Sequence, residues 1–440
     1  PDPYQANEPI TAITVTFLKG HTYVFGCGEY NKELDENNKN DDTLHYFKCK
    51  DEWTLCRLFL KLWSENHPDV ITGWNTKFFD IPYIINRFRK ILGEDDTRRL
   101  SPWYYISERK TVINGRELVA YNMEGIASLD YIELYKWYAP SGKNQESYRL
   151  DNIAHVELKE RKLSYEEYGN LHTLYKYNFQ KYIEYNIKDV HLLIRLEDKL
   201  RLLELGLTLA YDTKSNYEDI FAQTRMWDAL TYSHLLERHI IVPPRVIKEK
   251  DSAFEGAYVK EVKVGMHNWI ASFDLNSLYP HLMMQYNISP ETLIEPEDYT
   301  QEMRDVLSQG VTVEKMLNKQ IDLSGLKGLN VTITPNGQFF RTDVQGFLPK
   351  MLEEMYNDRK KFKKMMLEYR RQRQMCIRDR AYGATGSQYF RFYDLRMALG
   401  VTTAGQLSIR WIEKKINEYI NKILETNDDY VVASDTDSIY

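Results

Sequence analysis

Two short acidic segments could together bind a pair of divalent cations. Asp274 opens the segment 274–280, and Asp435 and Asp437 lie in a second segment close to Tyr440. Each segment follows an apolar run rich in strand-forming residues, so each carboxylate should be held at a strand end. Two such strands side by side would offer oxygen ligands to hard cations, as phosphoryl transfer requires. Short acidic strings also occur on solvated turns, so the two segments are far more specific together than either is alone.

Three other carboxylates stand out in the first half of the chain. Asp80 follows an apolar stretch. Asp189 lies four residues after Tyr185, so a helix would present Tyr185 and Asp189 on one face. Asp130 is the weakest of the three candidates. Carboxylates that hold cations, with a polar group that orients water, would suit a metal-dependent 3′→5′ exonuclease. On spacing alone, a helix-terminal Asp80 and a surface Tyr185/Asp189 pair is the better explanation.

A basic segment could bind a phosphate-bearing ligand, although the whole chain has a formal net charge of -6. Residues 359–380 contain ten Lys or Arg and two acids. Arg359 and Lys363 would share one face of a helix, with Lys360 beside them. Arginine contacts phosphate through two hydrogen bonds and lysine through a mobile point charge. The remaining cations of the run are better explained as a solvated helix face.

Length and composition indicate an ordinary globular protein of two or three domains. The 440 residues are 43% hydrophobic and contain no apolar run long enough to cross a membrane, so we expect no membrane partner. The first three residues lack the features of a signal peptide and look like an internal cut. The four cysteines show no C-x-x-C pairing, so we expect reduced thiols rather than zinc or disulfides.

Hydrophobic periodicity predicts alternating strands and helices, which is typical of an α/β fold. A hairpin with an Asn-Gly turn is expected over 111–119. Further strands are expected at 10–18, 23–27, 69–74, 254–266 and 269–273, and helices at 51–65, 81–92, across 171–205, at 348–373 and at 402–424.

These motifs together resemble those of a family B DNA polymerase of the tailed-bacteriophage replicative type, and the resemblance covers nearly the whole chain. Asp80 lies in what resembles the second exonuclease motif, and Tyr185 and Asp189 lie in what resembles the third. The hairpin resembles one that helps to move primer ends between sites. The first exonuclease motif, an Asp-x-Glu, is not found, so the resemblance implies that two metal ligands and the exonuclease activity are lost.

The resemblance also assigns roles in a polymerase site. Asp274 and Asp437 match its two metal-binding aspartates, the backbone carbonyl of Leu275 would be a further ligand, and Asp435 is a less directly involved neighbour. Tyr279 matches the aromatic residue that excludes a ribose 2′-OH. The other implied contacts are Ser277 and Leu278 beside that Tyr, Arg359, Lys360 and Lys363 on the triphosphate, Tyr382 and Gly383 on the nascent base pair, and Gly256, Ala257 and Tyr258 on the template backbone.

Three departures from the family pattern predict a weak or inactive polymerase. The middle motif should read Lys-x3-Asn-Ser-x-Tyr-Gly, but Met375, Asp379 and Arg380 stand at its Lys, Asn and Ser positions. Arg359 and Tyr382 are only 23 residues apart, which implies shortened fingers, and the segment 375–380 looks like a foreign splice. We also expect the end of the chain to remove the strand that should follow Asp437.

The resemblance implies a multidomain α/β fold. Its parts are an RNase H-like 3′→5′ exonuclease domain (1–201), a helical linker (202–245), a first palm segment with an antiparallel sheet (246–345), shortened helical fingers (346–387) and a second palm segment (388–440).

The implied function is template-directed DNA synthesis by two-metal nucleotidyl transfer. It would use two Mg²⁺ at the polymerase site and Mg²⁺ or Mn²⁺ at the exonuclease site. Primer–template DNA and dNTPs are the implied partners. A sliding clamp and a single-strand-binding protein would bind through regions outside this sequence, and the place of action would be the cytoplasm of an infected host cell. A stand-alone nuclease and a non-catalytic DNA-binding protein are the alternatives.

Overall fold

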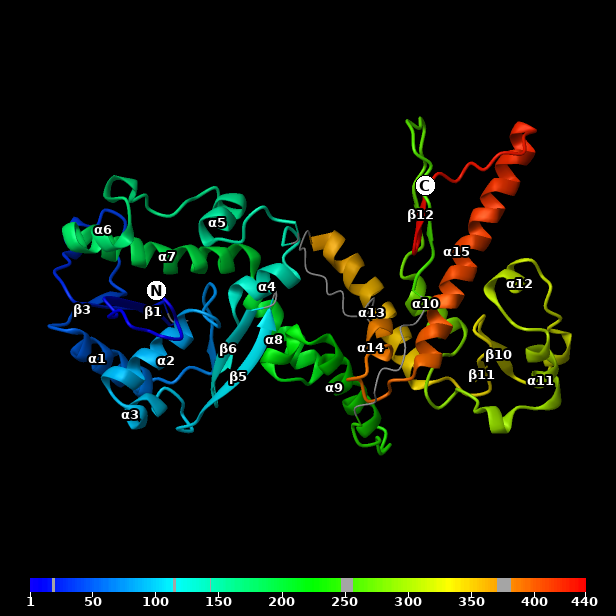
Figure 1. The fold of residues 1–440 in the computed structure, drawn as a ribbon, viewed down its shortest axis with the longest axis horizontal. Coiled ribbons are helices and arrows are strands. Elements are labelled where there is room, and N and C mark those ends of the chain that lie inside the picture. The colour runs from blue at the N-terminus through cyan, green and yellow to red at the C-terminus, as the bar shows by residue number, and fades with distance from the viewer. Residues whose placement is uncertain (18–19, 114–115, 143, 247–255, 370–380) are drawn as a thin grey trace. The chain divides into compact units, whose positions relative to one another are not determined.

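A computed structural model of the chain describes residues 1–17, 20–113, 116–142, 144–246, 256–369 and 381–440 (Figure 1). Contacts between residues divide the chain into two compact units, Pro1–Phe221 and Ala222–Tyr440. The finer domain boundaries expected from the sequence remain predictions. Among the described residues, no helix combines the length and apolar character needed to cross a membrane.

The first unit contains the mixture of parallel and antiparallel strands expected of an α/β fold. Strand β1 (Ala12–Thr16) pairs antiparallel with β2 (Thr22–Gly26), which pairs parallel with β3 (Leu44–Lys48). Strand β4 (Val70–Ile71) pairs parallel with β7 (Ala127–Ser128). The hairpin is confirmed by the antiparallel strands β5 (Ile106–Ile113) and β6 (Arg116–Met123), although its Asn114-Gly115 turn lies outside the described residues.

Helices cover these strands and bury the apolar faces that their sequences encode. The amphipathic helix α1 is capped at its N-terminus by Asp51, whose carboxylate accepts the Thr54 N–H. Its face packs with β2 and α2 around Phe25, Phe59 and Phe88 in one core cluster. The helices of this unit are α1 (Glu52–Glu65), α2 (Asp80–Ile91), α3 (Glu94–Arg98), α4 (Tyr131–Tyr138), α5 (Leu150–Leu158), α6 (Leu171–Tyr177), α7 (Phe179–Leu200) and α8 (Leu202–Thr213).

The second unit is built around a four-stranded antiparallel sheet in the order β8-β12-β13-β9. Its strands are short: β8 (Val259–Lys260), β9 (Phe273–Asp274), β12 (Ser434–Asp435) and β13 (Ser438–Ile439). A separate antiparallel pair joins β10 (Val331–Ile333) and β11 (Phe339–Arg341). The helices are α9 (Gln223–Leu236), α10 (Leu278–Gln285), α11 (Gln301–Ser308), α12 (Val313–Leu317), α13 (Phe347–Tyr369), α14 (Ala381–Thr385) and α15 (Leu395–Leu424).

Helix α15 supports the sheet of the second unit. Ile409 on this helix packs with Val431 and Ile439, which lie before and within the strands that carry the acidic residues. Helix α10 packs against both α13 and α15. Short 3-10 helices span Lys32–Leu34, Glu166–Tyr168, Tyr217–Phe221, Pro296–Asp298 and Ser324–Leu326.

Several strand predictions were wrong in extent. In place of strands over 254–266 and 269–273, the described residues form only β8 and β9, and Val264 and Trp269 are almost completely exposed. The apolar residues there lack the neighbouring strand and covering layer that a continuous ladder needs. The strand expected over 69–74 shortens to β4, although backbone hydrogen bonds with the neighbouring segment continue as far as the carbonyl of Gly73. The expected loss of the strand after Asp437 is also wrong, because β13 forms there and pairs on both sides.

Candidate functional site

Strand pairing brings the two acidic segments of the second unit together. β9 and β13 are antiparallel neighbours, with Asp274 directly opposite Ser438. The Ser438 hydroxyl donates to Oδ1 of Asp274 at 3.2 Å, and the Leu275 N–H donates to the carbonyl of Asp437 at 2.8 Å. Because these contacts follow from the register of the sheet, the two segments are fixed to each other through the backbone.

The turn that carries Asp437 is held on its other side by β8. Asp435 lies opposite Val259, and the Thr436 N–H donates to the carbonyl of Tyr258 at 3.1 Å. Thr436 adopts a left-handed backbone conformation (φ 55°), which closes the tight turn between β12 and β13. The sequence did not reveal that Tyr258 supports this turn, because the contact joins residues that lie far apart along the chain.

The charges of this site remain largely uncompensated. The pKa of Asp437 is raised, first by burial and then by the charges of Asp274 and Asp435. Asp274 and Asp435 are exposed, so their oxygens are accessible to an ion. Among the described residues, no group of three or more His, Cys, Asp or Glu is placed to hold a metal, so the candidate is the Asp274/Asp437 pair. Carboxylate oxygens of this kind fit Mg²⁺, which keeps several waters when bound.

The residues after Asp274 form a tight turn into α10. The Leu275 carbonyl accepts the Leu278 N–H at 3.1 Å, so one lone pair of this implied metal ligand is in use and one remains. Ser277 has a left-handed backbone (φ 58°) and its hydroxyl donates to Asn276. Tyr279 is partly buried in the first turn of α10, where its ring lies against Gly405 of α15.

The basic residues of α13 are placed on one helix, as the sequence predicts. Arg359 and Lys360 lie on α13, and the Lys360 ammonium lies over the ring of Tyr356, 4.4 Å from its centroid. Lys363 is also on α13, but its side chain is outside the described residues, as is that of Tyr382 on α14. Gly383 is exposed on α14. Met375, Asp379 and Arg380 lie outside the described residues.

The segment 256–258 contacts α15 directly. The Gln406 side-chain amide donates to the carbonyl of Gly256 at 2.8 Å, and the Arg410 guanidinium lies over the ring of Tyr258 at 5.2 Å. Ala257 joins these two residues and is exposed. The segment therefore lies beside the acidic turn, which is compatible with the DNA contact that the resemblance implies.

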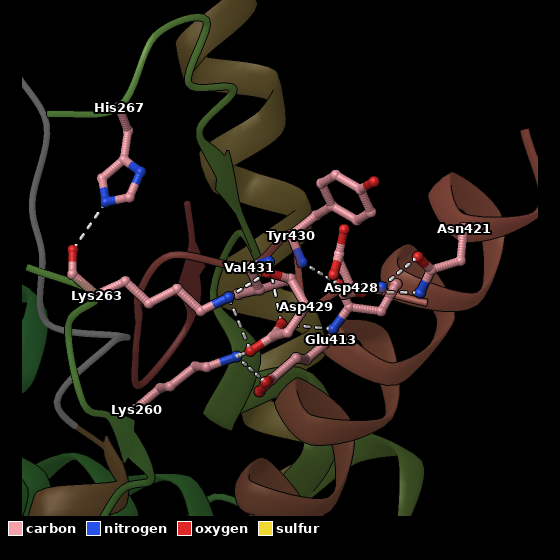
Figure 2. Close-up of polar contacts among 10 residues, drawn as sticks. Lys260, Lys263, His267, Glu413, Asn421, Asp428, Asp429, Tyr430 and Val431 are labelled. Atoms are coloured by element: carbon pink, nitrogen blue, oxygen red, sulfur yellow. Dashed lines mark hydrogen bonds and ion pairs between the residues drawn. The ribbon is translucent and has the colours of Figure 1, made fainter. Parts of the chain in front are cut away.

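A polar network ties β8 to α15 behind the acidic turn (Figure 2). Lys260 forms ion pairs with Glu413 of α15 and with Asp429, the latter at 2.8 Å. Asp429 also accepts from the Asn417 amide at 2.8 Å, and Asn417 in turn accepts the Tyr430 N–H. Burial alone would raise the pKa of Asp429, but hydrogen bonds from Lys260, Asn417 and Lys263 outweigh it and hold this pKa well below its usual range. No local pattern in the sequence predicted this network.

The first unit brings Asp80, Asp189 and Tyr185 to one cleft, together with Lys162. Asp80 is exposed to solvent, although protein surrounds much of its carboxylate. The partial loss of water around the carboxylate raises its pKa, and the charges of Asp130 and Asp189 act in the same direction.

Lys162 is a site residue that the sequence reasoning missed. Its ammonium donates to Oδ2 of Asp189 at 2.6 Å and to the Tyr185 hydroxyl at 3.3 Å. Burial lowers the pKa of Lys162, but the charge and hydrogen bond of Asp189, together with those of Tyr185, outweigh it and the pKa is raised overall. Burial raises the pKa of Asp189, and Lys162 only partly offsets this. Oδ1 of Asp189 is buried without a hydrogen-bond partner among the described residues, so it could accept a cation.

Asp130 has a structural position in this region. It caps α4, and its two oxygens accept the backbone N–H groups of Asn75, Lys77 and Ile132 at 3.0 to 3.1 Å. It is almost completely buried. Three backbone N–H groups depend on this carboxylate, so capping explains Asp130 better than metal binding does.

Comparisons with known proteins agree with this geometry. Residues 221–440 match DNA polymerase family B, and residues 1–153 match the exonuclease domain of DNA polymerase family B. The chain is 30% identical to the DNA-directed DNA polymerase of Escherichia phage RB69 and 30% identical to that of Enterobacteria phage T4. Both matches cover 100% of this chain and 56% of the relative, so the chain spans little more than half of their length.

A more distant similarity extends to eukaryotes. The DNA polymerase delta catalytic subunit of Candida albicans is 27% identical over 84% of this chain and 36% of its own length. With a match to the polymerase family across the unit that carries Asp274 and Asp437, and to its exonuclease domain across most of the other unit, the chain belongs to DNA polymerase family B.

Proposed function

We propose that this chain performs template-directed DNA synthesis from dNTPs on primer–template DNA. The observation that carries the proposal is the pairing of β9 with β13, which sets Asp274 opposite Ser438, the chain neighbour of Asp437. In this proposal the sheet β8-β12-β13-β9 is the core of a polymerase palm, and α13 carries cations toward the triphosphate.

Asp274, Asp437 and the Leu275 carbonyl would hold two Mg²⁺. Bound Mg²⁺ would stabilise the charge on the reacting phosphate and favour ionisation of the primer hydroxyl. Ser438 orients the Asp274 carboxylate, and Tyr258 holds the turn that presents Asp437. Tyr279 would bound the sugar site and Arg359 would contact phosphate.

We propose that the first unit is an RNase H-like exonuclease domain whose Asp80 and Asp189 would hold Mg²⁺ or Mn²⁺. The unpartnered Oδ1 of Asp189 and the raised pKa of Asp80 support a cation there, because a cation would relieve the repulsion between carboxylates. Lys162 would compete for Asp189, so we expect weaker metal binding than in the second unit. We propose a sliding clamp and a single-strand-binding protein as partners of the polymerase. Its proposed place of action is the cytoplasm of an infected host cell.

The test is primer extension by the purified chain with Mg²⁺ and four dNTPs, beside Asp274→Asn and Asp437→Asn. We expect slow extension that both substitutions abolish. Asp298→Asn, on an exposed 3-10 helix of the same unit, should behave like the parent chain. Extension that survives both aspartate substitutions would show that a different site, or a contaminant, performs the synthesis.

Two alternatives predict different results from the same preparation. A stand-alone nuclease would degrade single-stranded DNA and lose this activity on Asp80→Ala, without extending primers. A non-catalytic DNA-binding protein would bind DNA in a salt-dependent manner that persists in an Asp274→Ala/Asp437→Ala double variant. We expect slow extension because the middle motif is altered and the fingers are short. The altered positions fall within residues 370–380, which lie outside the described residues.

A further inference from the structure

We propose that Gly405 is a specificity-determining residue of the nucleotide site, because it leaves the space that the ring of Tyr279 occupies. Gly405 is buried in the middle of α15. A Cβ added there would lie 2.6 Å from Cε1 of Tyr279, 3.4 Å from Cδ1 and 3.7 Å from Cζ. The inference rests on the proposed function, since it concerns how the same site selects its sugar.

The Tyr279 ring occupies the space that a side chain at position 405 would fill. Tyr279 lies in the first turn of α10, which packs against α15, and helical geometry limits its χ1 to two rotamers. Non-bonded carbons keep about 3.5 to 4.0 Å apart, so a methyl group at position 405 would push the ring edge away by roughly 1 Å. The missing side chain at Gly405 therefore sets the depth at which the ring sits.

This depth matters because the proposed sugar selection is steric. A ring that excludes a 2′-OH must lie within about an ångström of its working position, since displacement either opens room for the hydroxyl or blocks the deoxyribose as well. Gly405→Ala should thus change both the affinity for a deoxynucleotide and its ratio to the affinity for a ribonucleotide. No chemical group of the site is altered by this substitution.

A matched control lies on the same helix. Gly400 is also buried in α15, but a Cβ there would meet Thr334 at 3.4 and 3.5 Å, which is close to ordinary contact. Alanine is favoured over glycine in helices, so both substitutions gain the same helix propensity. Gly400→Ala therefore shares with Gly405→Ala the gain in helix propensity and the buried position on α15, without the clash with Tyr279.

The experiment is a cycle of four proteins: the chain, Gly405→Ala, Tyr279→Ala and the double variant, with Gly400→Ala beside them. Binding of dATP and of ATP with Mg²⁺ is measured by calorimetry, and stability by urea unfolding. We expect Gly405→Ala to weaken dATP binding about tenfold and to change the dATP/ATP ratio. In the Tyr279→Ala background, Gly405→Ala should change the dissociation constants of both nucleotides and the equilibrium constant of unfolding by less than about twofold.

The outcomes separate this inference from the function on which it rests. If Gly405→Ala binds both nucleotides as Gly400→Ala does, or acts equally with and without the Tyr279 ring, the inference is wrong while the function stands. If the parent chain binds neither nucleotide, the function fails and sugar selection fails with it. If the unfolding data still show coupling between positions 405 and 279 in that case, the contact between the two residues is real and only the proposed function is wrong.

Discussion

The two acidic centres obtain their carboxylates in different ways. In the second unit, Asp274 and Asp437 lie on or beside neighbouring strands joined by a main-chain hydrogen bond, and no cation of the described residues is paired with either. In the first unit, Asp80 and Asp189 come from the helices α2 and α7, and Lys162 is paired with Asp189.

The negative charge of the carboxylates is therefore compensated differently in the two centres. A strand ladder fixes the backbone positions of two carboxylate residues close together, and the uncompensated charge then favours an external cation. Packed helices place carboxylates less tightly, and an internal lysine satisfies one of them before any metal arrives. We therefore expect tight metal binding in the second unit and weak binding in the first.

The largest effect should come from Asp437→Asn, measured by Mn²⁺ binding with electron paramagnetic resonance. Loss of groups that merely support a metal ligand already costs 10- to 100-fold in affinity, so loss of a ligand should cost at least about 100-fold. Asp189→Asn should remove only a weaker class of sites. If Asp189→Asn instead abolishes the tightest binding, the comparison between the two centres is reversed.

Lys162→Met should reveal the internal compensation in the first unit. Removing one partner of a buried pair costs about 3 to 5 kcal/mol, but Lys162 and Asp189 are 24% and 27% exposed, so we expect about 1 to 3 kcal/mol in urea unfolding. The double variant Lys162→Met/Asp189→Asn should recover most of this loss. A full loss in both proteins would show that the lysine stem, and not the charge, stabilises the unit.

The same contrast explains what the sequence could predict. Asp274 and Asp437 were found because each lies at the end of a short apolar run, a local pattern that survives even though the strands proved shorter than expected. Helix α1 and the hairpin β5-β6 were predicted for the same local reason. Lys162 was missed because its importance lies in a contact with Asp189, 27 positions away, that no local pattern encodes.

Exposed apolar residues misled the sequence reading in one region. The run that ends at Phe273 has the composition of a strand, but Trp269 and Ile270 are exposed and unpaired in any strand of the described residues. Strand propensity reports how a residue packs on a covered, paired surface, and neither condition is met there. Asp130 was the weakest of the three carboxylate candidates, and its hydrogen bonds from the Asn75 and Lys77 N–H groups depend on the tertiary fold, which no local pattern shows.

Asp130→Ala tests whether that residue belongs to the first centre or only to its scaffold. Three backbone N–H groups would lose their acceptor, so we expect a loss of about 1 to 3 kcal/mol in the unfolding free energy. Asp130→Asn, which keeps one acceptor oxygen, should lose less. A variant that unfolds normally but no longer binds Mn²⁺ in the first unit would make Asp130 a ligand after all.

The smallest effect should come from Asp429→Asn, which asks whether the network behind the acidic turn acts beyond stability. The folded pKa of Asp429 is lower than its unfolded value near 4, so its stabilisation is complete above about pH 4 and is lost as the pH falls below this. Because Asp429 is 42% exposed, we expect a loss below about 1 kcal/mol at pH 7 that shrinks toward pH 3. Asp428→Asn is the control, since Asp428 contacts Asn421 only through its backbone. Mn²⁺ affinity should stay unchanged, because the strand ladder alone fixes Asp437; a tenfold fall would mean that the ion pairs of Lys260 share this task.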